Sequence, residues 1–454
     1  MHMDKVNVLR RYGLFDAKVP RYTSYPPANR FEADQGAQHQ RQWLGAVPQD
    51  KPVSIYIHIP FCRRLCWFCA CRTQGTKTLA PVESYVTVLR KEIATIADTY
   101  LGSDMPMARL HLGGGTPTLL SAEIMNSLLA DVFARFAPTK DFEFSVEIDP
   151  TEASGEVLDA LATWGMNRAS IGVQDFAPKV QAAIGREQSI AQTQGIIDQL
   201  RQIGVQSLNV DLLYGLPFQT VSGLLRTLDQ VIALGPDRVA LYGYAHVPHV
   251  SKRQVMIPDA ALPDTQTRFD MSQAAGTHLT GAGYETLGID HFARASDSLT
   301  QAARAGTMTR NFQGYTDDCC ATLIGFGASA ISKFPQGYAQ NAVATSGYAR
   351  LVQGGGLAGA RGFSLSQEDK FVAAMIDAIM CQHKLTAPDI LHHFPDHAAD
   401  FDFALADLLR TFPDILARCP GGVALKPDFT AAARLIAARL DAALSGDHIH
   451  SLAI

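Results

Sequence analysis

Four cysteines stand close together early in the chain, and the spacing of three of them can hold an iron–sulfur cluster. Cys62, Cys66 and Cys69 form C-x3-C-x2-C, and Cys71 follows at once as C-x-C. Soft thiolate ligands suit iron–sulfur centres. Three ligands on one loop can hold a four-iron cubane by three of its irons, which leaves the fourth iron open to chelate a small molecule. The spacing therefore favours a centre that does chemistry.

Two other roles for these cysteines stay open but fit less well. A structural zinc ion usually takes four protein ligands, often from two C-x2-C pairs, and no second pair follows here. A disulfide needs an oxidising compartment, and nothing in the chain indicates one. The remaining cysteines are expected to be reduced and partly buried, and adjacent cysteines seldom bridge: they are Cys319, Cys320, Cys381 and Cys419.

Length and composition exclude several classes of protein. The chain has 454 residues, enough for two or three domains with a large core. A net charge of −5 without a long basic run argues against a dedicated nucleic-acid binder. We expect no signal peptide and no membrane span, because the start has no apolar stretch with a cleavage site and no run reaches about 18 apolar residues. The expected compartment is the cytoplasm.

Strand and helix patterns alternate from about residue 53 to residue 245. Between Val53 and Ile59 every second residue is apolar, which indicates a strand with one apolar face. Apolar residues then recur every three or four positions from Val82 to Ile96, the pattern of an amphipathic helix. Six such β/α units predict an α/β fold with a parallel sheet that forms a barrel or part of one. Further strands are expected at 108–112, 142–148, 169–173, 207–213 and 238–243, with helices near 121–136, 154–164, 189–203 and 221–234.

The flanking regions carry weaker patterns. Residues 1–50 are rich in Arg, Tyr and Pro and are expected to form an extended arm. The pattern is irregular from 245 to about 360, and the Gly354–Gly355–Gly356 run is predicted to be a turn or linker because no phosphate-loop residues flank it. Ser366 and Asp369 form a capping signature before an apolar helix, and mainly helices, one of them at 431–444, are expected to follow. The predicted division is an arm (1–50), a barrel (51–300), a connecting region that completes the active site (301–365) and a mainly helical C-terminal domain (366–454).

Unusual residues fall where the predicted strands end. In parallel β/α barrels the functional residues lie at the carboxyl ends of the strands. Glu147 alone would more often be a satisfied rim carboxylate, and Asp211 within an apolar strand is costly to bury unless it is hydrogen-bonded. Their coincidence on one rim with the cysteine loop favours a functional site. The segments on this rim are the cysteines, residues 111–117, residues 147–150, residues 174–175, Asp211 and residues 244–246.

The Gly-Gly-Gly-Thr-Pro stretch at 113–117 has two interpretations. Glycine lacks Cβ, so backbone groups can approach a ligand closely, as the ammonium group of a chelated amino acid requires. A tight strand-to-helix turn is the alternative. Three consecutive glycines exceed what a turn needs, so we favour the ligand interpretation.

The cysteine spacing after the first strand and Gly-Gly-Gly-Thr-Pro after the second resemble the radical S-adenosylmethionine (SAM) enzymes. Within them, the chain is most similar to the oxygen-independent coproporphyrinogen III oxidases, from about residue 9 through the C-terminal helices. The resemblance implies a partial (β/α)6 TIM-like barrel. The segments that carry it are Arg21-Tyr-Thr-Ser-Tyr-Pro, Tyr56-Ile-His-Ile-Pro-Phe, Tyr244-Ala-His, Asp290-His-Phe-Ala, Arg310-Asn-Phe-Gln-Gly-Tyr-Thr and Gly325-Phe-Gly-Ala-Ser-Ala-Ile.

The resemblance also implies which residues form the site. Cys62, Cys66 and Cys69 would hold a 4Fe–4S cluster, whereas Cys71 is characteristic of the family without being a ligand. One SAM would contact Tyr56, Gly114, Glu147 and Ile331, and a second SAM would contact Phe68, Gly115, Thr116, Gln174, Arg186, Asp211 and Ala245. The residues assigned to the reaction itself are Tyr56, Cys71, Arg21 and Arg310.

The implied activity is conversion of coproporphyrinogen III to protoporphyrinogen IX, in which two propionates lose CO2 and become vinyl groups. The propionate β-C–H bond is too strong for a side-chain base, but a 5′-deoxyadenosyl radical from SAM can take that hydrogen atom. The reaction needs an electron donor and an electron acceptor, neither of which the sequence identifies, and a monomer is expected. Cationic partners for the substrate carboxylates are sought among Arg21, Arg294 and Arg310.

Some positions depart from the pattern of the family. Ala70 stands where Gly is frequent, Gly243 stands where a larger residue can occur, and Cys319-Cys320 replaces a more polar stretch. The first two are expected near the second SAM and could alter its geometry.

Two competing functions remain at this stage. A haem-trafficking relative would bind haem without oxidase activity, but such relatives typically have Phe at the position of Cys71 and lack the Arg21–Pro26 arm. The presence of both features favours the oxidase. Another radical SAM reaction on a tetrapyrrole, such as methyl transfer or ring opening, would be separated by the mass of the product.

Overall fold

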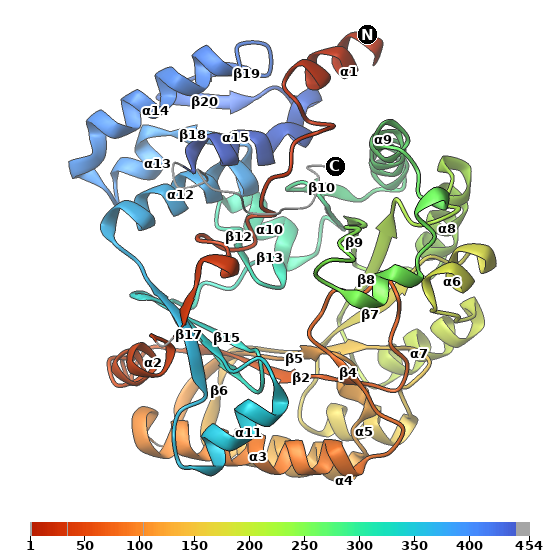
Figure 1. Cartoon of the computed structure of the whole chain (residues 1–454), viewed down its shortest axis with the longest axis vertical. Helices are drawn as coiled ribbons and strands as arrows, with labels where there is room; N and C mark the ends of the chain where they lie inside the picture. Colours follow the sequence, from red (N-terminus) through yellow and green to blue (C-terminus); the bar gives the residue numbers. More distant parts are fainter. Residues whose placement is uncertain (1, 34, 103, 442–454) are drawn as a thin grey trace.

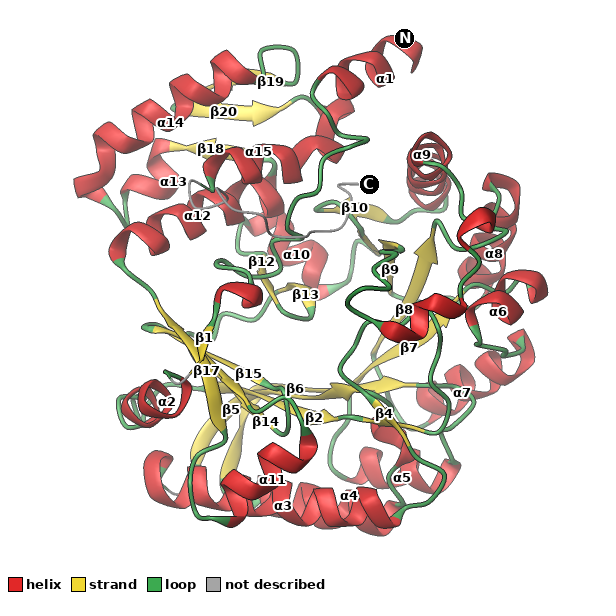
Figure 2. Ribbon diagram, viewed as in Figure 1, coloured by secondary structure: helices red, strands yellow, loops and turns green. Residues whose placement is uncertain are grey.

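A single sheet of 13 strands forms the centre of the molecule (Figures 1 and 2). The computed structural model describes residues 2–33, 35–102 and 104–441. The six predicted strands are present and lie side by side in parallel. The sheet order begins at β1 and ends at β10 without a closing pair, so the barrel is partial, as predicted. The six strands are β2 (Val53–Ile59), β5 (Met105–Gly114), β6 (Phe136–Ile148), β7 (Arg168–Gln174), β8 (Ser207–Tyr214) and β9 (Arg238–Gly243).

Helices cover the outer face of these strands, and Ser or Thr side chains cap several of their amino ends. The Oγ atoms of Ser121, Ser154, Ser189 and Thr220 each accept a hydrogen bond from a backbone N–H in the first turn. Figure 1 shows α3, α4 and α5 along one side of the barrel. These helices are α3 (Ala80–Ile96), α4 (Ala122–Phe133), α5 (Gly155–Thr163), α6 (Pro178–Ile184), α7 (Ile190–Gln202) and α8 (Val221–Ala233).

Alternation along the strands separates the core from the barrel interior. In β2, Ile55 and Ile57 are buried in the apolar core, whereas Tyr56 and His58 line a cavity inside the barrel. Successive strand side chains point to opposite faces, so one strand builds both the core and the cavity wall.

The region that the sequence analysis predicted to be irregular, 245–360, instead extends the sheet at both edges. Beyond β9 lie β11 (His291–Ala293) and β10 (Glu285–Leu287), and beyond β2 lies the parallel strand β14 (Leu323–Phe326). These strands have only three or four residues, too few for a periodic pattern to be recognised. The other elements of the region are α9 (Thr265–Gly281), α10 (Ser298–Ala305), β12 (Thr309–Asn311), β13 (Gly314–Thr316), β15 (Ile331–Phe334), β16 (Gly337–Asn341), α11 (Thr345–Gln353) and β17 (Gly359–Ser364).

The expectation of an extended N-terminal arm is wrong in part. Residues 1–50 contain α1 (His2–Arg11), α2 (Gly36–Leu44) and the short strand β1 (Glu32–Ala33). Between the helices, the chain runs without regular structure over most of its length, as predicted. Leu9 and Phe15 pack into a second core with residues of the C-terminal region, and this packing stabilises α1, a helix of only ten residues.

The C-terminal region is mainly helical but also contains a small antiparallel sheet of β18 (Lys384–Thr386), β20 (Gly422–Leu425) and β19 (Leu416–Cys419). The predicted capping box at Ser366 and Asp369 opens α12 (Gln367–Gln382). The helix predicted at 431–444 is present as α15 (Ala433–Leu440), and its last predicted residues lie outside the described ones. The remaining helices are α13 (Ala387–Leu391) and α14 (Ala398–Thr411).

The Gly354–Gly356 run follows α11 as a turn, with Gly355 at a φ of +79°, as predicted. Within the described part of the chain, every helix is too short or too polar to cross a membrane.

Candidate active site

The carboxyl ends of the parallel strands open into a cavity of about 950 Å³. Its walls come from the barrel strands, the cysteine loop, the N-terminal segment and α15. Every residue that the resemblance assigned to the cluster, to the two SAM molecules or to the reaction itself lines this cavity. They are Arg21, Tyr56, Cys62, Cys66, Phe68, Cys69, Cys71, Gly114, Gly115, Thr116, Glu147, Gln174, Arg186, Asp211, Ala245, Arg310 and Ile331.

The cysteine loop is fixed by backbone and side-chain contacts at several points. It starts at the short strand β3 (Phe61–Cys62), which pairs with β4 (Gln74–Gly75) on the far side of the loop. The Trp67 N–H donates to the Ile184 carbonyl over 2.9 Å, and the Ser251 hydroxyl donates to the Cys69 carbonyl over 2.9 Å. Neighbouring elements therefore hold the backbone that carries the thiols.

The sulfur atoms of the loop are not gathered as closely as three ligands of one metal ion would be. All four cysteines of the loop are free thiols. In the described residues, the only three potential ligand atoms within 4.8 Å of one another belong to the unrelated Glu368, His397 and Asp400. A zinc ion at about 2.3 Å from each sulfur would bring three sulfurs to within about 4 Å of one another. The described loop thiols therefore do not form a closed site for a single ion, and the cluster remains a prediction.

Neighbouring polar groups and burial shift the pKa values of the loop thiols in different directions. The backbone N–H of Cys71 donates to Cys69 Sγ over 3.4 Å, and hydrogen bonding from Cys71 lowers the pKa of Cys69 to about 6. Arg186 Nη1 donates to Cys66 Sγ over 3.5 Å and also pairs with Asp149 at 3.0 Å. Burial raises the pKa of Cys62 to about 11. Donors therefore stabilise negative charge on at least part of the thiol set.

Glu147 lies at the end of β6 and faces the glycine run at the end of β5. Its Oε2 accepts a hydrogen bond from the Gly114 N–H at 2.9 Å, and its Oε1 lies 3.4 Å from His111 Nε2. Burial raises the pKa of Glu147, but His111, the Gly114 N–H and His58 outweigh burial and hold it below its usual range. Glu147 is therefore a carboxylate at neutral pH.

The glycine run has a packing reason that the sequence analysis did not foresee. A Cβ at Gly114, whose φ is +112°, would lie 2.5 Å from the His58 ring, and a Cβ at Gly115 would lie 2.4 Å from the Phe61 carbonyl oxygen. A larger residue at Gly114 would have to displace the His58 ring on β2, and one at Gly115 would have to move the backbone of β3, where the cysteine loop begins. Close packing against β2 and β3 thus accounts for two of the glycines without a ligand, which leaves the ligand interpretation a prediction.

The buried carboxylate of Asp211 has the hydrogen-bond partners that a buried charge requires. Its carboxylate accepts hydrogen bonds from Ser170 Oγ and Asn209 Nδ2, both at 2.8 Å. Burial raises the pKa of Asp211, and these hydrogen bonds oppose the rise. Gln174, at the irregular end of β7, has a φ of +70°, which turns the chain at the cavity wall.

Two of the three candidate arginines for substrate carboxylates line the cavity. Arg21 Nη2 donates to the Gly243 carbonyl over 2.7 Å, and Arg310 Nη1 donates to Tyr315 Oη over 2.8 Å. Arg310 Nη2 also donates to the Arg21 carbonyl over 3.3 Å, which links the two residues.

The assignment of Arg294 as a third candidate is wrong. Its guanidinium donates to the Ala282 carbonyl over 2.8 Å, lies 3.9 Å from the centre of the Tyr284 ring and does not line the cavity. The reason is strand direction. Strand β11 runs antiparallel to β9, with Ala293 opposite Arg238 at the start of β9, so its end lies away from the rim.

Arg434 on α15 also lines the cavity, and the sequence analysis missed it. Its Nη2 donates to the Val19 carbonyl over 2.6 Å and its Nε to the Pro20 carbonyl over 3.1 Å, so it joins the C-terminal helix to the N-terminal segment. No sequence signal distinguishes it from any other arginine on an amphipathic helix.

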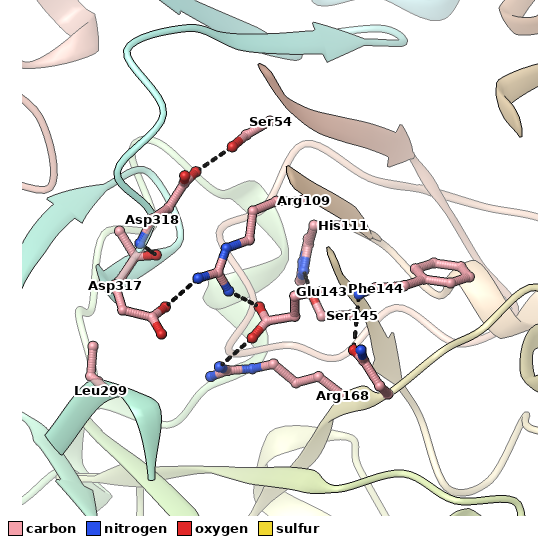
Figure 3. Close-up of polar contacts among 12 residues, drawn as sticks. Ser54, Arg109, His111, Glu143, Phe144, Ser145, Arg168, Leu299, Asp317 and Asp318 are labelled. Carbon is pink, nitrogen blue, oxygen red and sulfur yellow. Dashed lines mark hydrogen bonds and ion pairs between the residues drawn. The ribbon is translucent and has the colours of Figure 1, made fainter. Parts of the chain in front are cut away.

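A network of ion pairs lies below the rim (Figure 3), and two of its residues, Glu143 and Arg168, line the cavity. Arg109 Nη1 pairs with Glu143 Oε1 at 2.7 Å, and Arg109 Nη2 pairs with Asp317 at 3.1 Å. Arg168 reaches Glu143 Oε2 from the other side at 3.3 Å. The two arginines hold the pKa of Glu143 below its usual range although burial raises it. These four residues are called the polar floor.

Comparison with known proteins places this architecture. A sequence model of the radical SAM superfamily matches residues 56–231. An oxygen-independent coproporphyrinogen III oxidase of Cereibacter sphaeroides is 47% identical over 97% of both chains, and one of Paracoccus denitrificans is 45% identical over the whole of both chains. The solved structure of coproporphyrinogen III oxidase from Escherichia coli, titled as a radical SAM enzyme, superposes with a TM-score of 0.88 at 36% identity and covers 93% of this chain and 98% of its own.

The partial barrel, its cysteine loop and these matches define a radical SAM protein, a class that implies a 4Fe–4S cluster and SAM. Within that class, the identity over nearly the whole length is decisive. The chain belongs to the family of oxygen-independent coproporphyrinogen III oxidases. The haem-trafficking alternative is not favoured.

Proposed function

We propose that this chain converts coproporphyrinogen III to protoporphyrinogen IX without oxygen, by oxidative decarboxylation of two propionates to vinyl groups. One observation carries the proposal. A chain that aligns over 97% of its length with a named oxidase brings the cysteine loop, the rim carboxylates and two arginines into one cavity.

In the proposed site, Cys62, Cys66 and Cys69 hold the 4Fe–4S cluster. When bound, the cluster and SAM supply a 5′-deoxyadenosyl radical that takes a hydrogen atom from the β carbon of a propionate. The loop contacts support this assignment, because they place the three thiols on one wall without a disulfide. Cys71 contributes a backbone donor to Cys69 rather than a fourth ligand.

The proposed first SAM lies against Tyr56, Gly114, Glu147 and Ile331. Glu147 is already ionised and oriented by the Gly114 N–H, so it can accept a hydrogen bond from an ammonium group. Tyr56 Oη lies 2.8 Å from His58 Nδ1, and burial raises the pKa of Tyr56 well above its usual value, so its phenol stays protonated.

A second SAM is proposed against the rim residues of β7 to β9 and the cysteine loop. Asp211, whose orientation Ser170 and Asn209 fix, supplies an acceptor, and the Gly243 carbonyl is occupied by Arg21. A Cβ at Gly243 would lie 3.0 Å from Tyr214 Oη, so the small residue fits this packing. The proposed contacts are Phe68, Gly115, Thr116, Gln174, Arg186, Asp211 and Ala245.

The substrate carboxylates are proposed to meet Arg21 and Arg310. Each propionate that reacts gives one hydrogen atom to the radical, releases its carboxylate carbon as CO2 and gives one electron to an acceptor, which leaves a vinyl group. The other two propionates stay charged and need cationic partners in a cavity with a polar floor. The enclosing walls exclude water from the radical step.

The proposal includes a monomer in the cytoplasm, where thiols stay reduced. An electron donor and an electron acceptor remain to be identified. The test is anaerobic: protein reconstituted with iron and sulfide receives SAM, a strong reductant, coproporphyrinogen III and a cell-extract acceptor. We expect 5′-deoxyadenosine and protoporphyrin together. Deoxyadenosine with a substrate of changed mass but intact propionates would contradict the proposal and indicate another radical reaction.

A further inference from the structure

A short exposed segment after β9 forms the outer wall of the cysteine loop. The Gln254 side chain donates to the Phe68 carbonyl over 2.8 Å, and the Ser251 hydroxyl donates to the Cys69 carbonyl over 2.9 Å. Arg253 Nη2 donates to the Thr73 carbonyl over 3.0 Å. The segment thus contacts the backbone of the loop at three points, and Arg253 also lines the cavity.

The opposite side of this segment exposes apolar side chains to solvent. Residues Lys252–Met256 form a 3-10 helix that Ser251 precedes. The side chains of Ser251 and Gln254 are buried against the cysteine loop. Val255 is 69% exposed and Met256 55% exposed, and Val250 just before the helix is 52% exposed. Exposed apolar side chains gathered in this way mark an interaction surface more often than isolated ones do.

A second exposed group adjoins the first. The Phe218 ring is 43% exposed and lies 4.2 Å from Lys179 Nζ on α6, and the Phe218 N–H donates to the Ala261 carbonyl. The apolar cluster beneath joins the elements, because Ile257 packs with Val180, Ile184 and Leu216 and with the cysteine-loop residues Trp67 and Phe68. We call the exposed residues Lys179, Phe218, Val250, Lys252, Val255 and Met256 the outer patch, and its green turns lie beside α6 in Figure 1.

The charge around the outer patch is opposite to that of the whole chain. The protein has 39 Lys and Arg against 44 Asp and Glu. Between residues 61 and 79 there are four basic residues and no acidic residue. Segments 178–187 and 247–261 add three basic residues at the surface and two acidic ones, because the fourth basic residue, Arg186, is buried in the cavity wall beside Asp149. A surface that is basic on an acidic protein attracts acidic partners and orients them on approach.

We propose that the outer patch docks an acidic one-electron carrier protein that reduces the cluster. The inference rests on the proposed function, which requires one electron at the cysteine loop. One electron leaves the reduced cofactor of the carrier and enters the cluster held by Cys62, Cys66 and Cys69, and no atom is transferred.

Geometry explains why the electron enters here. Through the outer patch, the exposed surface is one layer of side chains from the Phe68 and Cys69 carbonyls, whereas the cavity side is reserved for SAM and substrate. Electron transfer falls steeply with distance, so a carrier that approaches the thin wall reduces the cluster without competing with the substrate. A small apolar centre with basic residues around it suits a transient complex.

The test compares exposed lysines on and off the outer patch. The variant Lys179→Glu with Lys252→Glu reverses two charges of the patch, and Lys140→Glu, exposed near the amino end of β6, is the matched control. Binding of an acidic protein that carries flavin mononucleotide, in its oxidised form, is measured by calorimetry with the reconstituted protein at about 50 mM salt. Cluster bleaching is then followed by stopped-flow absorbance with the reduced carrier and, separately, with dithionite.

We expect the double variant to weaken binding and carrier-driven bleaching about tenfold or more, with the control within about twofold and dithionite-driven bleaching unchanged in all proteins. Met256→Ser should weaken binding also at high salt, where charge is screened. Unchanged affinity in the double variant, or an equal loss in Lys140→Glu, would overturn the proposal. Because binding of the oxidised carrier needs no turnover, this result stands apart from that of the anaerobic assay of the proposed function.

Discussion

The rim and the floor of one cavity use the same strands in different ways. On β6, Glu143 lies in the floor between Arg109 and Arg168, whereas Glu147, four residues further on, faces the glycine backbone at the rim. The charged groups of the polar floor pair with one another, as Figure 3 shows, so their electrostatic interactions contribute to the fold and not to ligand binding. Rim groups contact backbone, thiols and cavity space, so they can still bind a ligand. Position along a strand, more than residue type, therefore separates the carboxylate that is paired within the fold from the one that we propose binds SAM.

The largest effect should come from the cysteine loop at the rim. Cys69→Ala removes a proposed cluster ligand, and we expect iron content to fall to less than half and 5′-deoxyadenosine formation to fall at least about 1,000-fold. Iron and sulfide analysis with absorbance spectroscopy measures the first, and chromatography measures the second. Cys71→Ser is the matched control, because it keeps the backbone N–H that donates to Cys69 and should keep its iron. Loss of iron in the control would make Cys71 a ligand.

A matched pair on β6 tests the difference between rim and floor directly. Glu143→Gln leaves the partly buried charges of Arg109 and Arg168 without their shared carboxylate and should destabilise the protein by about 1–3 kcal/mol, because Arg109 keeps its pair with Asp317. Glu147→Gln should change stability by about 1 kcal/mol or less while lowering activity about 100-fold or more. Thermal unfolding and deoxyadenosine formation are measured on both variants. If both variants lost stability equally, the rim and floor would not differ in the way described.

A buried carboxylate elsewhere sharpens the comparison, because no cation among the described residues pairs with it. Glu92 on α3 accepts hydrogen bonds from Tyr348 Oη, the Gly327 N–H and Asn341 Nδ2 at 2.7 to 2.8 Å. Burial raises the pKa of Glu92 to about 7, the opposite direction from Glu143 in the floor. Hydrogen bonds alone thus offset burial less than two arginines do.

The sign of the resulting pH dependence follows from this raised pKa. The folded protein holds the Glu92 proton more tightly than the unfolded chain, so its contribution to stability is complete below about pH 4.5 and is lost as pH rises through about 7. We expect wild-type stability to fall by about 2–3 kcal/mol more than that of Glu92→Gln between pH 5 and pH 8, measured by thermal unfolding. Parallel pH profiles of the two proteins would contradict the shift.

Periodicity predicted the parts of this fold that are long and alternate strictly. The strands β2 and β5 to β9 and the helices α3, α4, α5, α7 and α8 were predicted because each has enough residues to show a pattern, whereas α6, with seven residues, was not. The hydrogen bonds to Asp211 follow from the cost of burying a carboxylate. The three- and four-residue strands after 245 were missed because edge strands of that length are selected by their partners, not by their own sequence.

The sequence analysis also missed charged side chains that pair with partners far away in the sequence. Arg109 and Asp317 meet in the floor although 208 positions separate them, and neither has a local signal of pairing. Arg294 was kept as a candidate for the substrate carboxylates because the direction of its strand could not be predicted from the sequence. The partners of charged side chains and the direction of a strand depend on the tertiary structure, whereas the spacing of ligands on one loop is visible in the local sequence.

The smallest predicted effect concerns the two arginines that the sequence could not tell apart. Arg21 lines the cavity and Arg294 does not, so Arg21→Ala should weaken binding of coproporphyrinogen III about 10- to 100-fold, the range of a lost hydrogen bond to a charged group. Slow SAM cleavage without substrate should stay normal, because Arg21 contacts the Gly243 carbonyl and Arg310 rather than the cysteine loop. Arg294→Ala should leave substrate affinity unchanged. Equal affinity in wild type and Arg21→Ala, measured anaerobically by fluorescence titration, would remove Arg21 from the substrate site and leave Arg310 as its proposed cation.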